Sequence, residues 1–558
     1  MDCVYRIQHS KTDFMSFRTL LLVCCLCYAW GISPNPLFDV APQVSTHAGM
    51  VVGKLINVFD HEVAAFLGIP YAKPPLEDRR FKMPEPVEPW QGTLLTNRKP
   101  APCMQFSTLN YSFVPTAEST EDCLYLNVWT PVRDSSSSEP LPVMVWIYGG
   151  AFSSGSSELD LYDGGVLSSY GQVVVVSMNY RVGIFGFIDM GNEEAPGNVG
   201  LHDQISAMKW VKENIHHFGG DPDRITLFGS SAGALSVSLH LASPLSKGLF
   251  HRAIIQSGSA YHPDFFDSPT FASIKTSVVA ELVGCECENI TLETEPEIVF
   301  DCVKKTDPVT LSQTEFGISS KMVFWFMPSY PNEFLPLSPI EAFDEGNHTQ
   351  VDVLIGGLKD EGSLFLNFLL ADKFPLYQQP DITVDQIKPI LRILLRLSNE
   401  EDVETIHDFY FGNISENSKE IVKTVSHVFG NYVFNCAMMY LAEKMDNAHM
   451  YHISHRSQKS SVAEWVGATH YDDVPYVFGV PLRDSNNYSA EDAKFSEELM
   501  NRWVSFAYNG SLGEAEDSWP SFTRSNPATF ELNPKGSRPI QFPYKRDCEF
   551  LRPYFVAY

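Results

Sequence analysis

The sequence predicts an α/β protein with a large, mostly parallel central sheet flanked by helices. Short apolar runs rich in β-branched residues alternate with longer segments of helical periodicity, a pattern typical of parallel strands joined by helices. The expected strands are Leu141–Tyr148, Val173–Val176, Ile225–Phe228, Ala253–Ile255, Val351–Ile355 and His449–Ile453.

Helical periodicity is clearest between the strands expected over Val173–Val176 and Ile225–Phe228. A helix is expected over His202–His216, because Gly219-Gly220 and then Asp221-Pro222 follow it as stop signals. Two later regions, Val303–Phe343 and Ala371–Tyr432, carry helical and Pro-rich patterns that interrupt the alternation. We expect them to be insertions over the mouth of the sheet.

Composition and length favour one elaborated globular domain. Of the 558 residues, 44% are hydrophobic and 19% are charged, which excludes a disordered chain. No internal repeat and no linker divides the sequence, so residues 32–558 are expected to form a single domain. The formal net charge of −28 would repel anionic polymers, and we therefore expect no nucleic acid partner.

The N-terminus has the layout of a signal peptide. Arg6, Lys11 and Arg18 precede an apolar run over Leu20–Trp30, which is too short to span a bilayer as a helix. We expect residues 1–31 to be removed; the alternatives are an uncleaved anchor or a buried helix. Because the chain stops at Tyr558 without an apolar tail, the sequence predicts a secreted protein with no membrane span after processing.

Sequons and cysteines fit an exported protein. Six Asn-x-Ser/Thr sequons predict glycosylation, at Asn110, Asn289, Asn347, Asn413, Asn487 and Asn509. Seven cysteines remain after the leader, so most should pair and one must be left over. Cys285-x-Cys287 has no second ligand pair at zinc-site spacing, and we expect neither a metal nor a cofactor.

A candidate nucleophile lies on a predicted strand-to-helix turn. The strand Arg224–Phe228 leads directly into Gly229-Ser230-Ser231-Ala232-Gly233, and a helical stretch follows over Ala234–Leu241. Small residues on both sides allow the backbone to bend sharply and present the central serine at a helix N-terminus. Ser231 is therefore the expected nucleophile; the alternative is a Gly-rich turn with an idle serine.

Donors for a developing oxyanion are expected after another strand. Val143–Ile147 is followed by Tyr148-Gly149-Gly150-Ala151-Phe152, where small residues can turn backbone N–H groups inward. The expected oxyanion hole consists of Gly150, Ala151 and Ala232, and the alternative is an ordinary Gly-Gly turn.

Several further motifs follow one another along the chain, namely Phe66–Ala72, Glu121–Trp129, Gly197–Leu201 with Asp203-Gln204, and Phe218–Pro222. In these motifs and in their order the chain resembles the type-B carboxylesterase and cholinesterase family of α/β-hydrolases, from about Val52 to Phe555. The resemblance implies the α/β-hydrolase fold with helical insertions over the active-site mouth, and a small-molecule ester as substrate. It also allows a homodimer, because dimerisation through the C-terminal helices occurs in relatives.

The resemblance implies the remaining members of a catalytic triad. The family's acid lies in a Lys-Asp-Glu-Gly-Ser segment, here Lys359–Ser363, which makes Glu361 the acid. Its histidine lies shortly before an aromatic-rich Phe-Gly turn, which makes His470 the base. The order Ser231, Glu361, His470 is also the one that this fold demands.

The family's disulfides imply three bridges in this chain. They are Cys103–Cys123, Cys436–Cys548, and Cys302 with Cys285 or Cys287. We prefer Cys285, which leaves Cys287 unpaired.

Two departures from the cholinesterases weaken a choline-ester specificity. Ser230 stands where they carry an acidic residue, and residues 104–122 contain Phe106, Tyr111 and Phe113 but no choline-stacking Trp. Tyr111 or Phe113 could still stack on a cation, and Asp473 could supply charge near His470. Insect juvenile hormone esterases, which typically have Gln at the position of Ser230, are not favoured either.

The expected function is that of a secreted serine hydrolase that cleaves carboxylic esters through an acyl-enzyme. The alternatives are a cholinesterase and a non-catalytic binding or adhesion protein, although adhesion relatives lack triad members and usually carry a membrane span. The aromatic group Phe324-Trp325-Phe326 falls near the segment that shapes the acyl pocket in this family. Its rings are expected either to line that pocket or to belong to the core.

Overall fold

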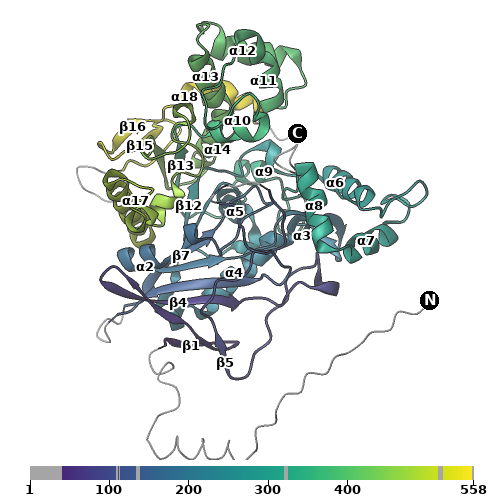
Figure 1. Cartoon of the computed structure of the whole chain (residues 1–558), viewed down its shortest axis with the longest axis vertical. Coiled ribbons are helices and arrows are strands. Elements are labelled where there is room, and N and C mark those ends of the chain that lie inside the picture. Colours follow the sequence, from purple (N-terminus) through teal and green to yellow (C-terminus); the bar gives the residue numbers. More distant parts are fainter. Residues whose placement is uncertain are drawn as a thin grey trace, which may run out of the picture. The chain divides into compact units, whose positions relative to one another are not determined.

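An eleven-stranded sheet runs through the protein, whose computed structural model describes residues 41–108, 111, 113–133, 139–319, 325–512 and 519–555 (Figure 1). Its strand order is β16-β15-β14-β13-β12-β11-β7-β8-β6-β4-β3. The seven strands from β15 to β8 are parallel to their neighbours. Antiparallel strands extend the sheet at both ends. The predicted fold class is confirmed.

The six expected strands all lie in the parallel part of this sheet. They are β7 (Leu141–Ile147), β8 (Val174–Met178), β11 (Gly220–Ser230), β12 (Arg252–Gln256), β13 (Asp352–Leu358) and β14 (Ala448–Ile453). Every residue of β7 and β8 is buried, because other elements cover both faces of the sheet at its centre. The remaining strands of the sheet are β3 (Lys54–Val58), β4 (His61–Pro70), β6 (Tyr125–Pro131), β15 (Ala528–Leu532) and β16 (Arg538–Gln541).

Long helices pack on the sheet and position the site. The helix expected over 202–216 is α4 (Val199–Asn214), which continues as a 3₁₀ turn and stops at Gly219 with a φ of 81°. The helix α5 (Ala232–Ala242) packs on β7, β11 and β12, whereas α17 (Ala490–Asn509) packs on β7 and β11. The short helix α2 (Gly165–Gly171) contacts β4, β6 and β8.

The two regions expected to be insertions are mainly helical in their described parts. The first contains α8 (Pro308–Ser319) and α9 (Pro339–Asp344). The second contains α11 (Ile387–Leu394), α12 (Glu400–Phe411) and α13 (Ser418–Gly430), which lie together beside α10 (Gly362–Leu370) in Figure 1. Phe316 and Met327 of the first region and Ala371 of the second line the cavity described below.

Smaller elements complete the described chain. A three-stranded sheet contains β1 (Gln43–Thr46), β2 (Gly49–Val52) and β5 (Thr93–Leu95), and a two-stranded one contains β9 (Asp189–Asn192) and β10 (Ala195–Pro196). The further helices are α3 (Gly183–Phe187), α6 (Pro269–Leu282), α7 (Pro296–Lys305), α14 (Cys436–Ala442), α15 (Val474–Val477), α16 (Val480–Arg483) and α18 (Lys545–Leu551).

Three disulfides close loops of very different length. They join Cys103 to Cys123, Cys285 to Cys302 and Cys436 to Cys548, which are the pairs that the resemblance implied, with Cys285 rather than Cys287 as the partner of Cys302. Cys287 is exposed and free. Each closed loop stabilises the fold by roughly 3 to 5 kcal/mol.

The features expected of an exported protein are distributed as follows. Five of the six sequon asparagines are exposed, namely Asn289, Asn347, Asn413, Asn487 and Asn509. Asn110 and the predicted signal peptide, residues 1–31, lie outside the described residues. Among the described residues, no helix is both long and apolar enough to cross a membrane.

Candidate active site

Ser231 lies on a sharp turn between β11 and α5. Its backbone has a φ of 59° and a ψ of −124°, and its N–H donates to the carbonyl of Gln256 at 2.9 Å. The turn requires glycine on both sides. A Cβ on Gly233 would lie 2.0 Å from the Ile147 carbonyl oxygen, and one on Gly229 would lie 2.6 Å from the Gly233 carbonyl carbon. The predicted spacing of small residues therefore has a steric cause.

Glu361 and His470 form a buried pair. Glu361 Oε2 lies 2.6 Å from His470 Nδ1, and the two side chains are 1% and 4% exposed. A carboxylate at Nδ1 favours the tautomer that carries its proton there, which leaves Nε2 free to accept one. Nε2 is buried without a hydrogen-bond partner among the described residues. The rings of Phe365 and Phe434 flank the imidazole, at centroid distances of 5.0 and 4.6 Å.

Ser257 supports the acid, and the sequence analysis did not identify it. Its hydroxyl donates to Glu361 Oε1 at 2.5 Å, and the Leu358 N–H donates to the same oxygen at 2.8 Å. Ser257 has a φ of 56° and directly follows β12. The only signal in the sequence is a polar residue followed by Gly258 at the carboxyl end of a parallel strand, where active-site loops gather in α/β folds.

The backbone of Gly150, Ala151 and Phe152 is held in an unusual conformation, with φ values of 121°, 55° and 57°. The Gly150 carbonyl accepts from Ser153 N and Ser154 N at 3.0 Å each, and the Phe152 carbonyl accepts from Gly183 N at 2.6 Å. Because C=O and N–H point in opposite directions across a trans peptide, the Ala151 N–H points away from Ser153 and Ser154. The Ala151 N–H is therefore a candidate donor for an oxyanion.

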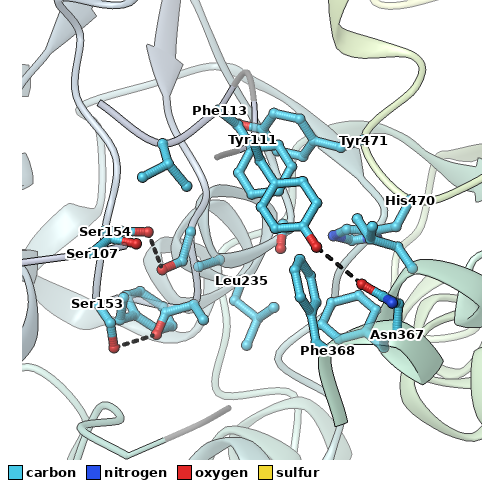
Figure 2. Close-up of a pocket in the computed structure, with 18 of the residues that line it drawn as sticks. Ser107, Tyr111, Phe113, Ser153, Ser154, Leu235, Asn367, Phe368, His470 and Tyr471 are labelled. Atoms are coloured by element: carbon cyan, nitrogen blue, oxygen red, sulfur yellow. Dashed lines mark hydrogen bonds between the residues drawn. The ribbon is translucent and has the colours of Figure 1, made fainter. Parts of the chain in front are cut away.

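One pocket brings the predicted site residues together. A cavity of about 300 Å³ is lined by Ser231, His470, Gly150, Ala151 and Ala232. Its other described lining is largely aromatic and includes Phe106, Tyr111, Phe113, Phe152, Phe265, Phe316, Phe365, Phe368, Phe434 and Tyr471. Figure 2 labels four of these rings, Tyr111, Phe113, Phe368 and Tyr471. Among the described residues that line it, none is Asp, Glu, Lys or Arg. A ligand bound here would therefore meet apolar surface and few polar groups.

Tyr111 and Phe113, between the cysteines of the first disulfide, line the pocket. The Tyr111 hydroxyl donates to Asn367 Oδ1 on α10 at 3.1 Å, as Figure 2 shows. Tyr111 also stacks on Phe113, with ring centroids 5.3 Å apart and planes 11° from parallel. Of the group expected near the acyl pocket, Trp325 and Phe326 are buried and do not line the cavity, whereas Phe324 lies outside the described residues.

Asp473 lies behind the pocket rather than in its lining. Gln256 Nε2 donates to its Oδ2 at 2.7 Å, while Oδ1 is buried without a partner among the described residues. Burial raises the pKa of Asp473 to about 6. Ser230 is likewise fully buried and does not border the cavity. The pocket therefore receives no direct contact from either side chain.

A second buried carboxyl group supports the loop that carries Gly150 and Ala151. Glu315, on α8, is 6% exposed, and its Oε2 accepts from Ile184 N at 2.8 Å. The neighbouring Gly183 N–H holds the Phe152 carbonyl, and a Cβ on Gly183 would lie 2.2 Å from Glu315 Oε2. Burial raises the pKa of Glu315 to about 7.

Comparisons with known proteins agree with this geometry. The model of the "Carboxylesterase family" matches residues 40–551. The chain is 38% identical to Acetylcholinesterase-1 of Trittame loki, over 97% of this chain and 99% of the relative. It is 35% identical to the acetylcholinesterase of Leptinotarsa decemlineata (92% and 85%) and 36% identical to the cholinesterase of Mus musculus (98% and 92%). The chain belongs to the type-B carboxylesterase and cholinesterase family and is a serine esterase, a carboxylic ester hydrolase.

Proposed function

We propose that Ser231, His470 and Glu361 hydrolyse carboxylic esters through an acyl-enzyme, and that the preferred substrates are uncharged. The observation that carries the catalytic part is the buried Glu361–His470 pair, whose unpartnered Nε2 belongs to the same pocket lining as Ser231. The absence of Asp, Glu, Lys and Arg from the described lining supports the preference for uncharged esters.

The reaction follows from the roles of these groups. Ser231 Oγ attacks the ester carbonyl carbon while His470 Nε2 takes its proton, and Glu361 stabilises the imidazolium. Backbone N–H groups of Gly150, Ala151 and Ala232 bind the oxyanion, helped by the N-terminus of the eleven-residue helix α5. His470 then protonates the leaving alcohol. Water attacks the acyl-enzyme by the same steps in reverse and releases the acid and free Ser231.

Choline esters are the second candidate substrate. The names of the relatives favour this candidate, and an aromatic lining can attract a quaternary ammonium through cation–π contacts. Against it stand Ser230, in place of an acidic residue, and the lack of Trp in residues 104–122. A pocket with no carboxylate in its described lining provides little compensation for desolvating a cation.

The test compares two thioesters that differ only in charge. Acetylthiocholine carries a trimethylammonium group, and S-(3,3-dimethylbutyl) thioacetate carries an uncharged tert-butyl group of the same shape. We expect the uncharged thioester to have the equal or higher kcat/KM, and Ser231→Ala to lower kcat by about 10⁴-fold or more. A tenfold preference for the cation would establish the choline-ester candidate. Equal turnover by wild type and Ser231→Ala would refute the catalytic proposal.

We also propose that the protein is secreted. The predicted signal peptide, five exposed sequon asparagines and the three disulfides support this location. Expression of the full chain in a eukaryotic secretory host should release a glycosylated protein whose first residue lies close to 32. Retention in the cells with residues 1–31 intact would contradict the proposal.

A further inference from the structure

Tyr471, which directly follows His470, has a backbone conformation that bulky residues rarely adopt. Its φ is 81°, in the left-handed region, and no glycine marks the position in the sequence. Such a conformation persists only where the surroundings hold it in place. Here the Tyr471 hydroxyl is hydrogen-bonded to that of Tyr162, and the Val474 N–H donates to the Tyr471 carbonyl at 3.3 Å.

The strained backbone places the ring in the wall of the pocket. The ring is 7% exposed, and its centroid lies 5.0 Å from that of Phe113. Phe113 stacks on Tyr111, and Tyr111 meets Phe368 edge to face at 4.9 Å. Figure 2 shows these four side chains gathered on the side of the pocket where His470 lies. We name Tyr111, Phe113, Phe368 and Tyr471 the aromatic wall.

The chemistry indicates which half of the ester lies against this wall. In the proposed mechanism His470 Nε2 gives its proton to the leaving oxygen, so the alcohol half must lie beside His470. Tyr471 is the next residue in the chain and lines the same cavity. The rings of the wall offer apolar faces that suit a flat, uncharged alcohol. Because the whole cavity measures about 300 Å³, we expect these rings to exclude a thick, branched alcohol.

We propose that Tyr471 determines the alcohol specificity of the enzyme and that its ring selects esters of flat, uncharged alcohols. This inference rests on the proposed function and adds the class of leaving alcohol to it. Tyr471 acts by filling space beside the alcohol half, so we expect it to change kcat/KM between alcohols and not between acyl groups.

The test moves one bulky group between the two halves of an ester. Phenyl acetate is the reference, 4-tert-butylphenyl acetate carries a tert-butyl group on the alcohol, and phenyl 3,3-dimethylbutanoate carries it on the acyl group. In Tyr471→Gly, which suits a φ of 81° without strain, we expect the kcat/KM ratio of 4-tert-butylphenyl acetate to phenyl acetate to rise at least tenfold. The corresponding acyl ratio should change less than twofold.

Three control variants separate ring volume from other effects. Tyr471→Phe keeps the ring and should keep the wild-type alcohol ratio. Gln172→Gly removes a left-handed non-glycine residue, with a φ of 50°, at an exposed position outside the pocket lining, and should also leave the ratio unchanged. Phe113→Ala widens the same wall without a change at Tyr471, so it should shift the ratio in the same direction even if Tyr471→Gly fails to fold.

The outcomes distinguish this inference from the proposed function. The role of the ring would be overturned if the alcohol and acyl ratios shifted equally, or if the acyl ratio shifted alone. It would also be overturned if Tyr471→Phe gave the same shift as Tyr471→Gly. Unchanged alcohol ratios in both Tyr471→Gly and Phe113→Ala, with Ser231-dependent turnover intact, would refute only this inference. Loss of Ser231 dependence in the wild type would refute the proposed function itself.

Discussion

Removal of the Ser257 hydroxyl tests whether support of the acid contributes to catalysis. Glu361 accepts hydrogen bonds from Ser257 Oγ, Leu358 N and His470 Nδ1. A hydrogen bond to a carboxylate contributes about 1.5–3 kcal/mol. Because two donors remain in Ser257→Ala, we expect a loss near the lower end, about 1.5–2 kcal/mol of transition-state stabilisation. That loss corresponds to a fall in kcat of about 10- to 30-fold.

The assay is steady-state hydrolysis of 4-nitrophenyl acetate, with the melting temperature measured alongside. KM should change little, since Ser257 is fully buried and does not line the pocket. Ser259→Ala is the matched control, because that hydroxyl is equally buried but donates to the Ala437 carbonyl at 3.0 Å. Alanine retains the strain at a φ of 56°, which glycine would relieve. A kcat within twofold of wild type, or an equal loss in Ser259→Ala, would refute the reasoning.

Three further predictions concern the acid, the turn and a buried carboxyl group. Glu361→Gln should lower kcat for 4-nitrophenyl acetate by about 10³- to 10⁴-fold, because the neutral amide no longer stabilises the imidazolium. The variant should remain folded, and a loss in kcat below tenfold would contradict the role of Glu361. Gly233→Ala should lower the free energy of unfolding in urea by at least about 3 kcal/mol, because its Cβ would meet the Ile147 carbonyl oxygen at 2.0 Å. Gly317→Ala should not destabilise the fold, because a Cβ at Gly317 would meet no atom of the described residues within 4 Å. The pKa of Glu315 is about 7 in the folded protein and 4.5 in the unfolded chain. Its contribution to the free energy of unfolding therefore falls as pH rises between these values, by about 3 kcal/mol at 1.36 kcal/mol per pH unit. Glu315→Gln should therefore gain stability relative to wild type between pH 4.5 and pH 8 in urea unfolding, and a difference independent of pH would rule this out.

The central strands could be predicted from the sequence because burial on both faces leaves continuous apolar runs. β7 and β8 are such runs, and the predicted bounds differ from the observed ones by a single residue or two. The antiparallel strands at the ends of the sheet were not predicted. β16 contains Arg538 and Pro539 and has no buried residue, so it lacks the apolar signal. The helix α4 begins three residues before the predicted start at His202. Its N-cap residue, Asn198, makes no side-chain hydrogen bond to the helix.

Site residues that stand in a recognisable local sequence motif could be identified from the sequence. Residues whose role depends on contacts with distant parts of the chain could not. Ser231 is marked by the glycines that its turn requires. Ser257 contacts Glu361 across 104 residues, and Glu315 contacts Ile184 across 131, so no local pattern reveals either contact. Tyr471 occupies a left-handed position where the sequence offers neither Gly nor Asn as a signal.

The apolar pocket also has a consequence for what remains after each turnover. Hydrolysis creates a carboxylic acid with a pKa of about 4, which ionises at neutral pH. The described lining supplies no basic side chain other than His470 to retain that anion, and the whole chain carries a formal charge of −28. Once it has left the backbone N–H groups proposed for the oxyanion, the carboxylate should rebind more weakly than the neutral alcohol, which the negative charge of the chain does not repel. Inhibition by accumulating product should accordingly come from the alcohol, and the enzyme should continue to work in high concentrations of the acid that it makes.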